Sequence, residues 1–286
     1  MISINTNYGG LFASKAASQS QRMLDTAMER LSTGKRINYA TDDAAGQAIA
    51  VRLQAEIEGI AMATRNVADA QSLMDTADGA LAETSNILLR MRELAVQAST
   101  GTLNSDDNAA LDAEFQQLEA EIDRIASSSK WAGSDLFTGT ARVFHIGTKA
   151  TDTLSHTIGK MAAHDLGVDS LGADNASGGT NADADIDADL TTATKAAAMI
   201  TAVDNAIKLV STERGKLGAL SNRLSSTITN LDQVRVNLSA SQGRIEDADF
   251  AEETSNLAKG QILQQAATAM LAQANASKQT VLTLIR

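Results

Sequence analysis

Four aspartates alternate with other residues late in the chain and offer the oxygen ligands that calcium prefers. They are Asp183, Asp185, Asp187 and Asp189. A calcium loop of the EF-hand type also needs glycine at its sixth position and glutamate at its twelfth. Counting from Asp183, these positions hold Ala188 and Thr194. The run therefore predicts a solvated acidic loop in preference to a calcium site.

Histidine and cysteine chemistry is also sparse. The chain has no cysteine, which excludes disulfides, thiolate zinc sites and cysteine nucleophiles. His145 and His156 are placed to face each other across a hairpin, and His164 follows it, but no further ligand stands at zinc spacing. No phosphate-binding glycine loop, dinucleotide fingerprint or nucleophile elbow occurs. We therefore predict no metal, no cofactor and no enzymatic activity.

The composition favours long helices. The 286 residues include no proline and only 3% aromatic residues, and without proline the commonest reason for a helix to stop is missing. The net charge of −11 argues against a general nucleic-acid binder, which needs a basic face. No apolar run reaches the length that spans a bilayer. The first residues do not form the basic and apolar regions of a Sec signal peptide, so none is expected.

Apolar and small residues recur at spacings of three and four, which is typical of helices that pack along a seam. The pattern predicts five helices. The first covers residues 13–31, the second runs from Asp42 or Asp43 to Gly101, and the third begins at Asn104 or Ser105 and has about 24 residues. The fourth has about 50 residues and extends up to Gly243, and the last covers residues 247–286. The second and fourth helices have similar lengths, so we expect them to pair antiparallel. Residues 131–165 predict a β-hairpin with its turn near 147–152, and residues 166–190 a loop. The fold class is mainly α: a long antiparallel coiled-coil helical bundle with a small β-hairpin region.

The two terminal helices offer few large apolar side chains. Those on their predicted seams are Leu24, Leu31, Leu263, Met270, Val281 and Leu284. Their full burial would contribute on the order of 10 kcal/mol, whereas ordering roughly 70 residues costs ~1 kcal/mol or more for each. This pair should therefore become fully ordered only when copies of the chain associate, and a head-to-tail contact that does not close gives a helical filament. The alternative is an ordinary helical bundle with frayed ends.

Long ordered segments at both ends of the chain resemble bacterial flagellin. They include Glu29–Asn38, Asp42–Ala50, Arg92–Ala98, Glu121–Arg124, Ser241–Phe250, Gln261–Ala266 and Leu271–Asn275. The matching segments cover nearly all of residues 1–130 and 200–286. The resemblance implies a structural subunit that polymerises into the flagellar filament for motility. A flagellin-like hook–filament junction protein or cell-surface binding protein is the alternative function.

The resemblance also implies a domain organisation and a set of partners. Residues 1–42 and 243–286 would form an inner coiled coil of terminal helices, residues 43–165 and 191–242 a helical rod with the hairpin, and residues 166–190 a short variable surface loop. The expected partners are further copies of the chain, an export chaperone, and cap and junction proteins. The expected route is flagellar type III export, and the expected location is extracellular, in the filament.

Members of this family are also recognised by innate immune receptors. The residues that match the toll-like receptor 5 contact motif are Arg90, Leu94 and Glu114. Arg90 and Leu94 are four residues apart and so lie on one helix face, and Glu114 follows on the returning helix. The alternative is that Leu94 and its neighbours pack inside the rod or between subunits.

Overall fold

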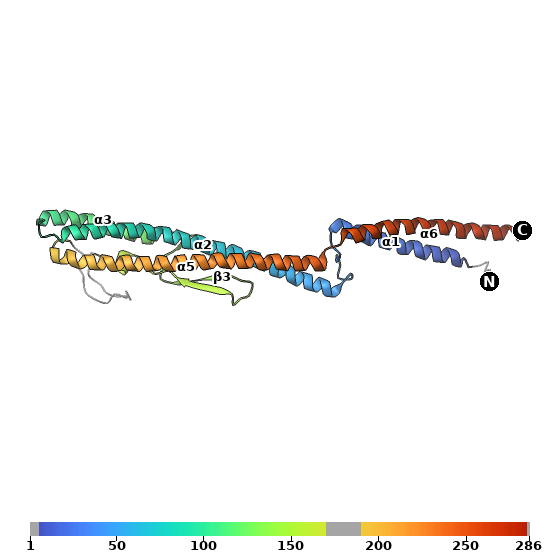
Figure 1. The fold of residues 1–286 in the computed structure, drawn as a ribbon, viewed down its shortest axis with the longest axis horizontal. Coiled ribbons are helices and arrows are strands. Elements are labelled where there is room, and N and C mark those ends of the chain that lie inside the picture. The colour runs from blue at the N-terminus through green and yellow to red at the C-terminus, as the bar shows by residue number, and fades with distance from the viewer. Residues whose placement is uncertain (1–5, 170–189, 285–286) are drawn as a thin grey trace. The chain divides into compact units, whose positions relative to one another are not determined.

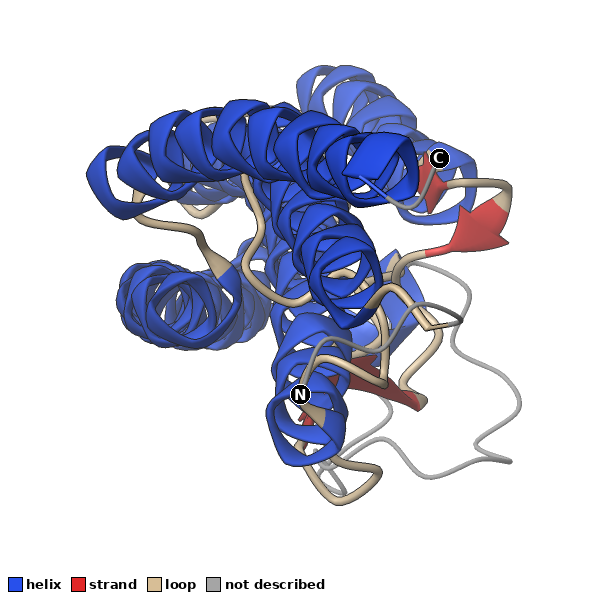
Figure 2. Ribbon diagram, turned by 90° about the vertical axis from the view of Figure 1, so that its right-hand side faces the viewer, coloured by secondary structure: helices blue, strands red, loops and turns tan. Residues whose placement is uncertain are grey.

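The computed structural model describes residues 6–169 and 190–284, with side chains described as far as residue 277. Helices make up most of these residues, and the strands are short (Figure 2). The chain divides into two compact units, which we call unit 1 (Met1–Glu58 and Arg235–Arg286) and unit 2 (Gly59–Val234). Within the described part of the chain, no helix combines the length and apolar character needed to cross a bilayer.

The elements follow one another as long helices interrupted by one β-rich stretch (Figure 1). They are α1 (Tyr8–Thr33), α2 (Ala44–Ala98), α3 (Ser105–Ser128), β1 (Lys130–Trp131), β2 (Ser134–Asp135), β3 (Ala141–His145), β4 (Thr153–Thr157), α4 (Ala163–Leu166), α5 (Ala193–Glu246) and α6 (Phe250–Leu284). The mainly α fold class is therefore confirmed. Helices α2 and α5 have 55 and 54 residues, lengths that a proline-free sequence permits.

Polar side chains set the helix boundaries where the sequence indicated. The carboxylate of Asp43 accepts the N–H of Gly46 at 2.9 Å, just inside the start of α2. Asn104 and Asp107 form a capping box at the start of α3. Helix α1 ends at Gly34, whose φ of 72° is left-handed and favours glycine. The predicted caps at these three positions are confirmed.

Polar contacts join α2 to α5 within unit 2, and the residue numbers of three of them rise along α2 while they fall along α5. They are Gln71 with Ser221 at 3.5 Å, Asp78 with Arg214 at 2.8 Å, and Arg92 with Asp204 at 2.6 Å. In unit 1, Gln242 likewise donates to Gln54 at 2.9 Å. The predicted antiparallel pairing of these two helices is confirmed.

A single hydrophobic cluster between residues 67 and 224 fills unit 2. Helix α5 buries the predicted heptad residues Val203, Val210, Leu217 and Leu224. Helix α2 buries a broader face than one seam would need, because it packs against both α3 and α5. The additional buried residues beside its predicted stripe include Leu81 and Leu88. Burial of this extent supplies most of the hydrophobic stabilisation of the described chain.

Strands β3 and β4 form the predicted antiparallel hairpin, with Phe144 opposite Leu154. They are joined by residues 146–152, where Ile146 donates its N–H to the carbonyl of Asp152 at 2.9 Å. The turn predicted near 147–152 is therefore confirmed. Leu154 is buried in the cluster of unit 2, so the hairpin packs onto the helices through one face.

The histidine arrangement predicted from the sequence is wrong. In the observed register His145 pairs with Thr153, and His156 pairs with Arg142, so the two histidines are not opposite each other. The position of the turn sets this register, and one residue of shift changes every partner. Among the described residues no group of three or more metal-binding side chains occurs. The acidic run from Asp183 to Asp189 lies outside the described residues.

Two small elements were missed in the sequence. Strands β1 and β2 form a tight antiparallel pair whose turn places Ala132 and Gly133 at φ 48° and 81°. The short helix α4 lies where the sequence predicted the end of the hairpin region. Both elements are too short to show a periodic pattern, and only the glycine at the turn gave a local signal.

Candidate functional site

The terminal helices α1 and α6 lie side by side in unit 1 and meet through small side chains (Figure 1). The residues buried on this seam are Ala13, Ser20, Leu24 and Ala27 from α1, and Glu253, Gly260 and Ala267 from α6. A Cβ atom added at Gly260 would lie 2.9 Å from Cγ of Leu24, so glycine is what permits this leucine to pack against the backbone of α6. The seam is thin, because mostly small residues fill it.

The predicted seam is correct on α1 and displaced on α6. Leu24 is buried and Leu31 is half-buried, as expected. Leu263 and Met270, however, are 40% and 64% exposed, so their predicted burial between the two helices is wrong. Gly260, Gln264, Ala267, Leu271 and Ala274 face inward instead. Val281 and Leu284 fall in the last part of the chain, whose side chains are outside the described residues.

Helix α6 therefore has two apolar faces, of which only one contacts α1. The second comprises Ile262, Leu263, Ala266 and Met270, at helical spacing, and we call it the outer α6 face. All four residues are exposed. A contiguous exposed apolar patch of this kind marks an interaction surface in soluble proteins.

The first turns of α1 add exposed aromatic side chains to the terminal pair. Tyr8 and Phe12 are 71% and 77% exposed, and Leu11 beside them is also exposed. Asn7 in front of the helix donates to Asn275 of α6 at 3.3 Å, so this end of α1 is held against its partner helix. The large apolar groups thus point away from the seam, where they are available to another molecule.

Polar contacts fix how α1 and α6 are aligned. Arg30 Nη1 lies 2.8 Å from an oxygen of Glu253, whose side chain is almost fully buried. Gln264 donates to Gln21 at 2.7 Å near the middle of the pair. An ion pair that is removed from water stabilises only when its geometry is retained, so the Arg30–Glu253 pair favours one alignment of the two helices over others.

The segment that follows α1 pairs with the end of α5 inside unit 1. Lys35 forms a bridge of the antiparallel β type with Asp247, and its ammonium group lies 2.5 Å from Glu246. Arg36 donates its backbone N–H to the carbonyl of Glu246 at 2.6 Å, and Ala248 donates to Gly34 at 3.0 Å. Backbone pairing thus joins the segment after α1 to the segment before α6.

The loop between α1 and α2 is closed by a carboxylate. Asp42 accepts the backbone N–H groups of Tyr39 at 3.1 Å and Asn38 at 3.2 Å. These hydrogen bonds stabilise the ionised form and lower the pKa of Asp42. The pKa of Tyr39 is raised, because its hydroxyl group donates to the carboxylate of Glu29 and lies near that negative charge.

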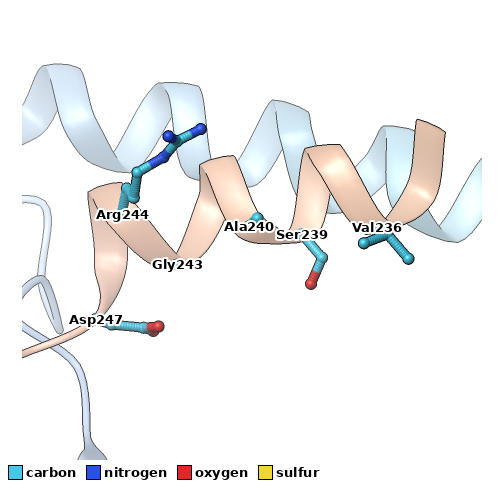
Figure 3. A pocket seen from close by; sticks show the side chains of 6 residues that line it. All are labelled: Val236, Ser239, Ala240, Gly243, Arg244 and Asp247. Atoms are coloured by element: carbon cyan, nitrogen blue, oxygen red, sulfur yellow. The ribbon is translucent and has the colours of Figure 1, made fainter. Parts of the chain in front are cut away.

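A shallow hollow lies on the last turns of α5, also in unit 1 (Figure 3). Its lining residues are Val236, Ser239, Ala240, Gly243, Arg244 and Asp247. Val236 and Ser239 point to the same side of the helix, and Arg244 points to the other side (Figure 3). The hollow is open and holds no nucleophile with an adjacent base, so it suits contact with a protein surface better than catalysis.

The predicted receptor residues are only partly brought together. Arg90 donates through Nε and Nη2 to Glu114 at 3.0 and 2.8 Å, and through Nη1 to Glu93 at 2.9 Å. The hydrogen bonds to Glu114, and then the one to Glu93, raise the pKa of Arg90. Leu94 is only 1% exposed and belongs to the core of unit 2. The alternative stated from the sequence, that Leu94 packs inside the rod, agrees with its position in the single chain.

Comparison with known families identifies both ends of the chain. The bacterial flagellin N-terminal helical region matches residues 4–142, and the bacterial flagellin C-terminal helical region matches residues 200–285. The chain is 44% identical over 260 residues to a flagellin of Halalkalibacterium halodurans, covering 91% of each sequence. It is 41% identical over 307 aligned residues to flagellin of Bacillus subtilis, covering 99% of each.

A solved structure supports the fold independently of close sequence similarity. A putative flagellar hook-associated protein from Vibrio parahaemolyticus aligns with a TM-score of 0.58 and 16% identity. The alignment covers 72% of this chain and 100% of that one. At this identity the likeness shows the fold alone.

Proposed function

We propose that the terminal helix pair, α1 with α6, is the surface through which copies of the chain associate. The chain belongs to the bacterial flagellin family and is a structural subunit that polymerises into the flagellar filament. Membership of this family also means that the protein is not an enzyme. The alternative of a junction or surface-binding protein is not favoured, since flagellins match over nearly the whole chain.

The observation that carries the proposal is the outer α6 face. Helix α6 presents Leu263 and Met270 to solvent although its other face already packs against α1. A helix that is apolar on two sides is stable when both sides are covered. In the filament, helices of neighbouring copies supply the second cover, and polymerisation then completes a core that the single chain leaves unfinished.

The same reasoning supports ordering of the terminal helices on assembly. The buried apolar residues that unit 1 contributes are few and mostly alanine, so the intramolecular seam recovers little of the entropy lost on ordering. Residues 1–42 and 243–286 would then form the inner coiled coil of the filament, with Leu24, Leu31, Leu263, Met270, Val281 and Leu284 in its polymerisation core. Residues 43–165 and 191–242 would form the surrounding rod, and 166–190 its surface loop.

The location and the other partners of the chain rest on family membership. An extracellular filament requires secretion, for which the family resemblance indicates flagellar type III export with a chaperone, and assembly under a cap protein next to junction proteins. The exposed Arg90–Glu114 pair supports recognition by toll-like receptor 5, because two charged groups held 2.8 Å apart present a fixed polar feature on the surface. Leu94 would join that contact only if the packing around it changed, since it is buried.

Seeded elongation tests the assembly surface. Leu263→Asp places a charge on the outer α6 face, and we expect it to abolish elongation of filament seeds measured by sedimentation. Val143→Asp is the matched control, because Val143 is also exposed but lies on strand β3 of unit 2. Circular dichroism should show the same helix content for both variants. Normal elongation by Leu263→Asp would contradict the proposed surface.

A further inference from the structure

The chain has nine methionines, and those within the described residues differ sharply in exposure. Four of them are buried in unit 2: Met74, Met91, Met161 and Met199. Met270, on the outer α6 face, is 64% exposed, and Met28 of α1 and Met62 of α2 are also exposed. Solvent therefore reaches the thioether of Met270 in the single chain, whereas the core thioethers are shielded.

An exposed thioether is a target for peroxides. The sulfur attacks one oxygen of hydrogen peroxide, the O–O bond breaks, and the products are methionine sulfoxide and water. The sulfur is oxidised by two electrons and the peroxide is reduced by the same two, so no further reactant is needed. The reaction turns a flexible apolar side chain into a polar one, and methionine sulfoxide reductases reverse it.

We propose that Met270 is an oxidation site that controls assembly: the free subunit reacts with peroxide at this thioether, and the resulting sulfoxide prevents addition to the filament. The inference rests on the proposed function, because it needs the outer α6 face to be covered by another copy. In the filament the same cover excludes peroxide, so incorporated subunits keep Met270 reduced.

The neighbours of Met270 explain why this position matters. Ala266 and Leu263 lie one and two turns before it on the same face, so the sulfoxide oxygen would enter an apolar contact. A buried polar group without a hydrogen-bond partner weakens association, and we expect oxidation to raise the critical concentration for polymerisation about tenfold. Met62 belongs to unit 2 and provides a comparison at similar exposure.

The test uses full-length monomer treated with hydrogen peroxide and then added to filament seeds of the same chain. Peptide mass spectrometry measures sulfoxide at each methionine, and sedimentation measures the critical concentration. We expect treated wild-type protein and Met62→Leu to lose assembly, and treated Met270→Leu to retain it, because leucine conserves volume and helix propensity without an oxidisable sulfur. Incubation of oxidised wild-type protein with methionine sulfoxide reductases should restore assembly.

A second measurement compares monomer with filament. Met270 should form sulfoxide at least about ten times more slowly in filaments than in monomers, as expected for a thioether removed from solvent. The inference would be overturned if assembly of Met270→Leu remained sensitive to peroxide, or if Met270 were oxidised equally fast in monomers and in filaments. Neither result would affect seeded elongation of untreated protein. Failure of untreated wild-type protein to elongate seeds would overturn the proposed function and, with it, this inference.

Discussion

Units 1 and 2 are built from the same kind of helix and differ in what they bury. The core cluster of unit 2 includes large residues such as Phe115, Leu81 and Met199, all shielded from solvent. Among the described residues of unit 1, the buried apolar side chains are Ala13, Leu24, Ala27, Ile37, Ala50 and Ala267. Most of the large apolar side chains described in unit 1 are exposed instead, including Phe12 and Met270. Similar helices can therefore bury a large apolar core in one unit and leave most of the large apolar side chains exposed in another, and we propose that further copies cover the second.

Deleting parts of unit 1 gives the largest expected effect. Removal of residues 1–40 or of residues 245–286 should abolish seeded elongation completely, because each deletion takes away one helix of the terminal pair. The remaining chain should stay helical and unfold cooperatively, since the core cluster of unit 2 is intact. Sedimentation and thermal circular dichroism measure the two properties. Filament growth by either truncated chain would show that assembly does not depend on both terminal helices of unit 1.

Matched leucine-to-alanine changes compare the two units directly. Leu81→Ala removes a fully buried side chain from unit 2 and should lower the free energy of unfolding by about 2–5 kcal/mol. Leu263→Ala removes an exposed side chain and should change the stability of the free chain by less than about 0.5 kcal/mol. Urea denaturation of the monomer measures both values. Equal losses would show that the outer α6 face is already buried without assembly.

A smaller effect is expected at the close contact between α1 and α6. Gly260→Ala adds a Cβ atom 2.9 Å from Cγ of Leu24, and we expect it to weaken the terminal pair by about 1 kcal/mol despite the better helix propensity of alanine. Gly218→Ala is the control, because nothing lies within 4 Å of its added Cβ, and it should stabilise α5 by about 0.5–1 kcal/mol. Hydrogen exchange of the α1 amides and urea denaturation measure these changes. Greater protection of α1 in Gly260→Ala would contradict the observed packing.

The smallest predicted effect concerns pH. The pKa of Asp42 is lowered from its ordinary value of 3.8, so the stabilisation of the loop after α1 is fully present above that value and is lost as the pH falls through the lower folded pKa. We expect faster exchange of the Asn38 and Tyr39 amides, relative to intrinsic rates, only under such acid conditions. In Asp42→Asn this dependence should disappear. A loss of protection near neutral pH in the wild-type chain would show that another group controls the loop.

The long helices could be predicted because their patterns repeat many times. The heptad residues of α5, such as Val210 and Leu217, are buried as predicted, and polar positions in the same stripe, such as Arg214, make cross-helix contacts. The error on α6 has a definite cause: Ala267 and Ala274 face α1, whereas Leu263 and Met270 belong to a second face. A sequence with two neighbouring apolar faces does not indicate which of them the chain covers itself.

The receptor residues show a different limit. Arg90 and Glu114 could be paired from helix geometry, and the structure joins them. The alternative stated from the sequence placed Leu94 inside the rod, and Leu94 is buried in the core of unit 2. The spacing of Arg90 and Leu94 puts both on one face of α2, but it does not distinguish an exposed contact residue from a core residue.

Polar contacts between α2 and α5 also determine how unit 2 resists a pull along its helices. Sliding one helix past the other by a heptad, roughly 10 Å, would separate the Asp78–Arg214, Gln71–Ser221 and Arg92–Asp204 partners together. Tension applied along the two helices loads these contacts and the apolar seam in shear. The load is shared among the contacts, so they do not break one after another from one end. Unit 2 can therefore transmit force along its helices without gradual sliding of α2 past α5.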